Sequence, residues 1–225
     1  MSLRAPGLVG LPEIFPVFPL SGALLLPNGK LPLNIFEPRY RALTDDALAP
    51  PRMFGMIQPD VARPAGERGP GLCRIGCLGR LSSFSEAEGD RYLVALSGVI
   101  RFVLVEEVEM RRGYRRVRGE FSRFADDLLS PDDLPPACDR AELLTVLRRY
   151  FASRGIEANW EAVEQMPDDT LVTTLCMVCP FEPQEKQALL EAATPTDRAS
   201  ALMALLQMGA HAQSADQGSG RSQAS

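Results

Sequence analysis

The chain is poor in several residue types on which catalytic and membrane-bound proteins rely. Its 225 residues include one histidine, His211, and two lysines, Lys30 and Lys186. The longest apolar stretches, GALLLP and LVTTLCMVCPF, are far shorter than the roughly 20 residues needed to cross a bilayer. Neither follows a basic N-terminus, as a secretion signal would. We therefore expect a cytoplasmic protein that does not associate with membranes.

The known catalytic motifs are also missing. The one Gly-Lys pair, Gly29-Lys30, is followed by Leu31 and lacks the earlier glycine of a phosphate-binding loop. His211 stands where the last expected helix ends, and a fraying end cannot hold a catalytic base in place. No G-x-S-x-G elbow occurs. We expect a non-enzymatic protein with no catalytic residue and no cofactor, and we rate an unrecognised enzyme below the binding functions considered next.

Five cysteines without a secretion signal are expected to be reduced thiols. Cys73-x3-Cys77 and Cys176-x2-Cys179 invite comparison with a four-thiolate zinc site. Structural zinc sites normally use tight loops, whereas these pairs lie in an apolar expected strand and on one face of an expected helix. We therefore expect core cysteines and no metal site.

The first half of the chain has the pattern of short β-strands. Apolar runs are broken by proline, glycine or asparagine, which favours edge strands and turns. The charged SEAEGD (85–90) predicts a hairpin turn between two longer runs. The expected strands lie in IFPVFPL (14–20), ALLLP (23–27), KLPLNIF (30–36), RMFGMIQP (52–59), LCRIGCLGRLSSF (72–84), RYLVALSGVIRFVLVEEV (91–108) and YRRVRGEF (114–121).

A helical period replaces this pattern after the linker SPDDLPP (130–136). Leu143, Leu147 and Tyr150 lie on one face of an expected helix, and Gly155 is positioned to end it. Three or four more helices follow, with expected N-terminal caps at Asp168 or Asp169, at Glu182 before Pro183, and at Thr194 before Pro195.

These patterns predict an α+β protein rather than alternating βαβ units. We expect an N-terminal extension (1–11), a β-rich subdomain (12–129), a helical subdomain (130–212) and a disordered polar tail (213–225).

The most distinctive stretch is LPLNIFEPRY (31–40). Pro38 marks a helix start, because its missing N–H would be unpaired at the first helical position. Glu37 then lies at the positive end of the helix dipole, where a carboxylate is stabilising. The following helix is expected to bury Tyr40 and Leu43. We interpret the decamer as a strand-to-helix joint, with ligand contacts by Glu37 and Arg39 as the alternative.

The same residues resemble the opening of the Lon N-terminal domain, the substrate-binding domain of the ATP-dependent Lon protease. The shared pattern is Phe18-Pro19-Leu20, Pro27, Leu31-Pro32-Leu33 and Ile35-Phe36-Glu37-Pro38-Arg39-Tyr40, and GCLGRL (76–81) and LSGVIRF (96–102) are similar to later strands. The resemblance implies a PUA-like β pseudo-barrel followed by a C-terminal helical bundle that recognises protein substrates. Since no residues match the family's ATPase or peptidase motifs, we expect a stand-alone recognition module.

Such a module would bind unfolded or client polypeptides, or dock on a protease or chaperone partner, through an exposed apolar groove. The seam between barrel and bundle is one candidate for this groove, and the last helix is another. The candidate peptide-binding residues are Glu37, Arg39, Tyr40, Met203, Leu206 and Met208.

RNA binding is the main alternative, because PUA-like folds can bind RNA. The segment RRGYRRVRGEF (111–121) would use Arg111, Arg112, Arg116 and Arg118 on phosphates and Tyr114 on a base. The net charge of −5 argues against it. A cross-strand ladder with Glu106, Glu107, Glu109 and Glu120 would use the same arginines, and we favour the ladder.

Overall fold

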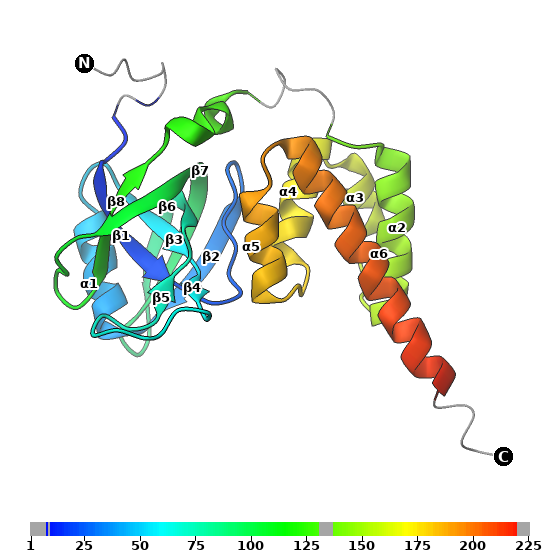
Figure 1. Ribbon diagram of the computed structural model, residues 1–225, viewed down its shortest axis with the longest axis horizontal. Helices are drawn as coiled ribbons and strands as arrows, with labels where there is room; N and C mark the ends of the chain where they lie inside the picture. Colours follow the sequence, from blue (N-terminus) through cyan, green and yellow to red (C-terminus); the bar gives the residue numbers. More distant parts are fainter. Residues whose placement is uncertain (1–7, 9, 131–136, 220–225) are drawn as a thin grey trace.

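The computed structural model describes Leu8 and residues 10–130 and 137–219, with side chains described as far as His211. The chain forms a β-barrel followed by a bundle of helices, and the barrel and the bundle lie side by side (Figure 1). This arrangement confirms the predicted α+β class. Among the described residues, no helix is long and apolar enough to span a membrane.

The barrel closes because β7 pairs with both β6 and β8. Around the ring the order is β7, β6, β3, β1 and β8, with β1 and β3 parallel and the other pairs antiparallel. A separate two-stranded ribbon joins β4 and β5. The strands are β1 (Ile14–Pro19), β2 (Lys30–Ile35), β3 (Met53–Ile57), β4 (Pro59–Asp60), β5 (Gly71–Leu72), β6 (Ile75–Ala87), β7 (Arg91–Glu107) and β8 (Arg115–Glu120).

The long strands β6 and β7 extend beyond the ring. The C-terminal part of β7 pairs with β8, whereas its N-terminal part, residues 92–97, pairs with β2. As a result, β2, β7 and β6 form a three-stranded sheet beside the barrel. The hairpin predicted at SEAEGD is confirmed, since β6 ends at Ala87 and β7 begins at Arg91.

Helix α1 (Pro38–Ala47) follows β2 and begins where the proline predicts. Tyr40 is buried and its ring lies 4.0 Å from that of Phe18 on β1, centroid to centroid. Leu43 is fully buried on the same side. The decamer is therefore a strand-to-helix joint that fixes α1 to the barrel.

The prediction of a strand in ALLLP (23–27) is wrong. These residues form an irregular loop, although Leu24, Leu25 and Leu26 are buried as deeply as any strand. The loop packs directly on glycines of the barrel: a Cβ on Gly98 would lie 2.0 Å from the Leu26 carbonyl oxygen. Burial without strand pairing explains why an apolar run alone was misleading here.

After β8, the 3-10 helix η1 (Ser122–Leu128) leads toward the bundle. Glu182 and Thr194 precede their helices as predicted, and Gly155 ends α2 with a φ of 62°. Neither Asp168 nor Asp169 is a cap, since Pro167 holds that position and both lie in the first turn. The helices are α2 (Arg140–Arg154), α3 (Trp160–Gln165), α4 (Asp168–Val178), α5 (Pro183–Glu191) and α6 (Pro195–Ser219).

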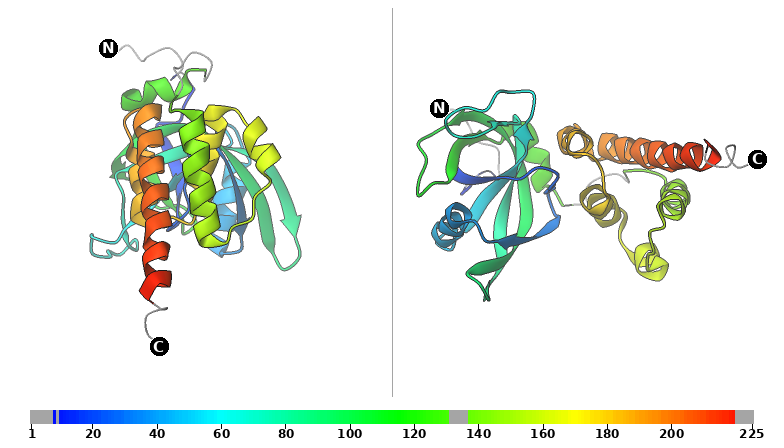
Figure 2. Two further views of the ribbon diagram at one scale, coloured as in Figure 1. Left: turned by 90° about the vertical axis from the view of Figure 1, so that its right-hand side faces the viewer. Right: turned by 90° about the horizontal axis from the view of Figure 1, so that it is seen from below.

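Helices α2 and α6 run side by side (Figure 2), and α6 projects past the rest of the bundle. The expected end of the helical region at residue 212 lies within α6, which continues to Ser219. The tail was predicted disordered from its polar composition, but residues 213–219 continue the helix. Positions 220–225 of that predicted tail, and most of the predicted extension 1–11, lie outside the described residues.

Candidate functional site

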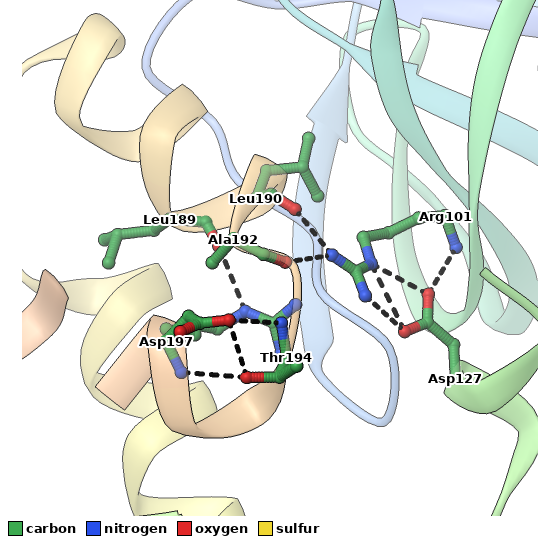
Figure 3. Close-up of polar contacts among 8 residues, drawn as sticks. Arg101, Asp127, Leu189, Leu190, Ala192, Thr194 and Asp197 are labelled. Carbon is green, nitrogen blue, oxygen red and sulfur yellow. Dashed lines mark hydrogen bonds and ion pairs between the residues drawn. The ribbon is translucent and has the colours of Figure 1, made fainter. Parts of the chain in front are cut away.

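The junction between barrel and bundle is built around Arg101 of β7 (Figure 3). Its guanidinium is buried and holds the carboxylate of Asp127 in η1, with Nη2 to Oδ1 at 2.8 Å and Nε to Oδ2 at 2.9 Å. Nη1 donates to the carbonyls of Leu190 and Ala192, at 3.1 and 2.5 Å. One side chain thus joins β7, η1 and the C-terminal end of α5.

A second buried arginine reinforces this end of α5. Arg198 of α6 donates from Nε to the Leu189 carbonyl at 3.0 Å. Burial, and then the positive charge of Arg101, lowers the pKa of the Arg198 guanidinium. Both guanidiniums bind carbonyls at the C-terminal end of a helix, where the helix dipole favours positive charge.

Polar contacts continue along α5 toward the barrel. Lys186 donates from Nζ to the Gly22 carbonyl at 2.9 Å, and burial lowers its pKa. Gln187 donates to the Ile75 carbonyl at 3.1 Å, and Gln58 of the barrel donates to the Pro183 carbonyl at 2.9 Å. Side chains of α5 therefore fill the seam along this helix with hydrogen bonds. It is not an apolar groove there.

The three decamer residues proposed for ligand contact have structural partners. Glu37 precedes α1 and forms an ion pair with Arg39, whose Nη2 lies 2.7 Å from Oε2. The Arg39 guanidinium also stacks over the Tyr40 ring, 4.5 Å from its centroid. Tyr40 is buried, while Glu37 and Arg39 are partly exposed.

The structure does not bring the three residues proposed on α6 together on one surface. Leu206 is fully buried, whereas Met208 is 65% exposed. Met203 is half-buried and lines a shallow cavity of about 390 Å³ between α6 and the start of α2. Leu206 is therefore part of the bundle core, which leaves Met203 and Met208 as the accessible members of the set.

The arginine cluster on β8 and the turn before it is paired with carboxylates. Arg118 binds Glu106 and Glu13, and Arg115 binds Glu107 with Nη2 to Oε1 at 2.6 Å. Arg111 and Arg112 instead contact α1: Arg111 binds Asp46, and Arg112 binds Asp45 and Asp46. Carboxylates thus neutralise most of the cluster, partly as the predicted ladder and partly through aspartates of α1.

Tyr114 anchors this contact between the turn and α1. Its hydroxyl donates to the Asp46 carboxylate at 2.5 Å. The hydrogen bond from Tyr114, followed by the neighbouring arginines, lowers the pKa of Asp46. Burial and the same hydrogen bond raise the pKa of Tyr114 to about 12. The ring is almost fully buried, so it cannot stack on a base in this conformation.

A groove that the sequence did not predict lies on the outer face of the β2-β7-β6 sheet. Its volume is about 440 Å³. Leu93 at its wall is 47% exposed, and Phe36, directly after β2, is 65% exposed. The groove is lined only by uncharged residues, which are Pro32, Leu33, Asn34, Ser83, Ser85, Leu93, Val94 and Ala95. Alternation of these residues along three strands was the available signal, but their partners across the sheet were not visible in the sequence.

The cysteines are free thiols, and three of them are buried, as predicted for Cys77, Cys176 and Cys179. Burial raises the pKa of Cys176 to about 12 and that of Cys179 to about 11. Cys73 departs from the prediction, since it lies between β5 and β6 and is only half-buried. Within the described part of the chain, no three His, Cys, Asp or Glu side chains gather as ligands for a metal ion.

The combination of barrel and helical bundle also occurs in solved Lon N-terminal domains. A Lon N-terminal domain protein from Xanthomonas campestris matches with a TM-score of 0.57 and 22% identity, over 85% of this chain and 97% of that one. The N-terminal domain of Mycobacterium avium complex Lon protease matches with a TM-score of 0.60 and 15% identity, over 86% and 98%. These likenesses establish the fold.

The sequence profile of the ATP-dependent protease La (LON) substrate-binding domain matches residues 14–208, so the chain belongs to this family. It is similar to Lon protease 2 of Myxococcus xanthus, 29% identical over 48% of this chain and 13% of that protein. It is also similar to the Lon protease of Syntrophus aciditrophicus, 27% identical over 80% of this chain and 23% of that protein. The chain thus spans less than a quarter of the length of these two relatives. The resemblance first noted in LPLNIFEPRY is confirmed.

Proposed function

We propose that this chain binds unfolded polypeptides, for delivery to a protease or chaperone partner, and that its role is recognition rather than catalysis. The observation that carries the proposal is the uncharged groove beside β2, with Leu93 and Phe36 exposed at its border. Exposed apolar side chains on one face of a sheet are a candidate contact surface for an apolar client. Membership of a substrate-binding domain family supports the same reading.

We favour the groove because other parts of the protein cover most of the other candidate surfaces. Side chains of α5 fill the seam along that helix, and Leu206 is buried in the bundle. Met208 of α6 remains a competing exposed apolar residue, and Met203 remains one at the cavity beside α2. Glu37 and Arg39 remain candidates for contacts beside α1. Substituting one residue in the groove and one on α6 shows which of the two apolar surfaces binds the client.

The test measures binding of reduced, carboxymethylated lactalbumin, a permanently unfolded chain, with native lactalbumin as the negative probe. Leu93→Asp should weaken binding at least tenfold, because it places a charge in the groove. Val105→Asp, at another site on β7 that is 56% exposed, is the matched control and should bind normally. Loss of binding in Met208→Asp, with Leu93→Asp unaffected, would move the site to α6. Absence of binding by the unmodified protein would overturn the proposal.

RNA binding through Arg111, Arg112, Tyr114, Arg116 and Arg118 is the alternative function. The carboxylates bound to Arg111, Arg112 and Arg118, and the burial of Tyr114, argue against it. A labelled single-stranded RNA in the same assay decides the matter. Salt-sensitive RNA binding that is lost when Arg111, Arg112, Arg116 and Arg118 are changed to Ser would replace the proposal.

A further inference from the structure

Strand β2 is an edge strand. Among the described strands it pairs with β7 alone, and its other side faces no strand. An unpaired strand edge presents a row of N–H and C=O groups that another extended chain can bind.

The register determines which groups face outward. In an antiparallel pair, alternate residues direct their N–H and C=O groups toward the partner strand. Gly98 of β7 donates to the Gly29 carbonyl at 2.8 Å, so residues 31, 33 and 35 continue the bonding to β7. Lys30, Pro32 and Asn34 therefore direct their backbone groups away from the sheet. Pro32 fits this assignment, because proline in a sheet is tolerated where its nitrogen faces outward.

The residues whose backbone groups point outward also have exposed side chains. The side chains of Lys30, Pro32 and Asn34 are all exposed, whereas Leu33 and Ile35 on the opposite face are buried. The edge offers two donors, the N–H groups of Lys30 and Asn34, and three carbonyl acceptors. A strand added here would extend the sheet and place alternate side chains next to the groove that Pro32 and Asn34 already line.

Charge selects among extended chains. No residue lining the groove is charged, but a cation lies at each end of the same face: Lys30 opposite Ser97, and Arg91 two residues before Leu93. Neither cation forms an ion pair within the described chain. Glu86, on β6, falls on the opposite face by strand alternation. In the register of β2, Arg91 is level with position 36, so the two cations are about 20 Å apart along a strand.

We infer that β2 binds its client as an added β-strand, and that it prefers an uncharged, β-prone segment of about five residues with an acidic residue at each end. This inference rests on the proposed function, since it names the chemistry of the client that the groove receives. Main-chain hydrogen bonds would supply affinity that is independent of sequence, and Lys30 and Arg91 would supply the preference for acidic flanks.

The test uses two fluorescein-labelled peptides with the core Val-Thr-Val-Thr-Val, one flanked by Asp and one by Lys, and measures fluorescence anisotropy. Asn34→Pro removes one outward N–H, and Asn34→Ala keeps it, so the pair isolates the backbone bond. We expect Asn34→Pro to weaken binding of the Asp-flanked peptide about fivefold or more, and Asn34→Ala to leave it within twofold. Lys30→Glu combined with Arg91→Glu should reverse the preference between the peptides.

Each contrary outcome identifies what fails. Equal binding by Asn34→Pro and Asn34→Ala would overturn strand addition, and equal binding of both peptides by the unmodified protein would overturn the charge preference. If carboxymethylated lactalbumin still binds in either case, the proposed function survives while this inference fails. A dimer of the protein that Asn34→Pro abolishes would also overturn it, because a second copy would then occupy the edge. Circular dichroism confirms that the variants are folded.

Discussion

Replacing Arg101 with Met should destabilise the protein severely. The substitution leaves Asp127 buried without its partner, and the carbonyls of Leu190 and Ala192 lose a donor. Removal of one member of a buried ion pair costs about 3–5 kcal/mol. Each carbonyl left unpaired in the interior adds about 1–3 kcal/mol when water cannot replace the donor. We therefore expect a loss of at least about 3 kcal/mol, a large part of the 5–15 kcal/mol typical of a domain.

Urea unfolding followed by two probes measures this loss. The single tryptophan, Trp160, lies in α3 and reports on the bundle through its fluorescence, whereas far-UV circular dichroism reports on the whole chain. Arg118→Met is the matched control: its ion pairs with Glu106 and Glu13 are exposed and screened by solvent, so it should destabilise the protein far less than Arg101→Met does. The double variant Arg101→Met/Asp127→Leu should be more stable than Arg101→Met alone, because it leaves no buried carboxylate without its partner. If Arg101→Met stays within about 1 kcal/mol of the unmodified protein, the junction does not depend on this ion pair.

Three further predictions concern other parts of the molecule. Tyr114→Phe should lower the free energy of unfolding at neutral pH. Because the pKa of Tyr114 in the folded protein is raised to about 12, the difference in unfolding free energy between Tyr114→Phe and the unmodified protein should shrink as the pH rises from about 10 to about 12. A difference that stays constant up to pH 12 would contradict this prediction. Gly98→Ala should lower the free energy of unfolding by about 1–3 kcal/mol or more, since its Cβ would lie 2.0 Å from the Leu26 carbonyl oxygen. Gly66→Ala, where a Cβ meets nothing within 4 Å, is the control in the same urea titration. At pH 8, Cys176 and Cys179 should react with iodoacetamide only after unfolding, because burial raises the pKa of these thiols to about 12 and about 11; mass spectrometry that finds them alkylated as fast as Cys138 in the folded protein would refute this.

The sequence predicted features that depend on neighbouring residues. Pro38 begins α1, Gly155 ends α2, and Thr194 with Asp197 caps α6, because each signal lies within one turn of the feature it sets. Prediction from the sequence failed where the local structure depends on contacts with residues far away in the chain. The loop of Leu24 to Leu26 has the apolar pattern of a strand, and only its packing on Gly79 and Gly98 distinguishes the two.

The candidate site was even less accessible to sequence reasoning. Ser83 on β6 and Ala95 on β7 carry no chemical signature, and they line a groove only because the register places them side by side. The junction has the same character, since Arg101 meets Leu190 across 89 positions of sequence. The aspartate partners of Arg111 and Arg112 were missed because α1 precedes them by more than sixty positions.

The pairing of β1 with β8 has a consequence for synthesis. Ile14 is opposite Arg118, so the first strand of the barrel waits for a partner made about a hundred residues later. At a synthesis rate of about 5–20 residues per second, that wait lasts about 5–20 s. During this interval the edge of the apolar β1 that will pair with β8 has no partner strand. The ring of the barrel therefore closes only after residue 120 has been made, and the helices of the bundle, which begin at Arg140, are made after that.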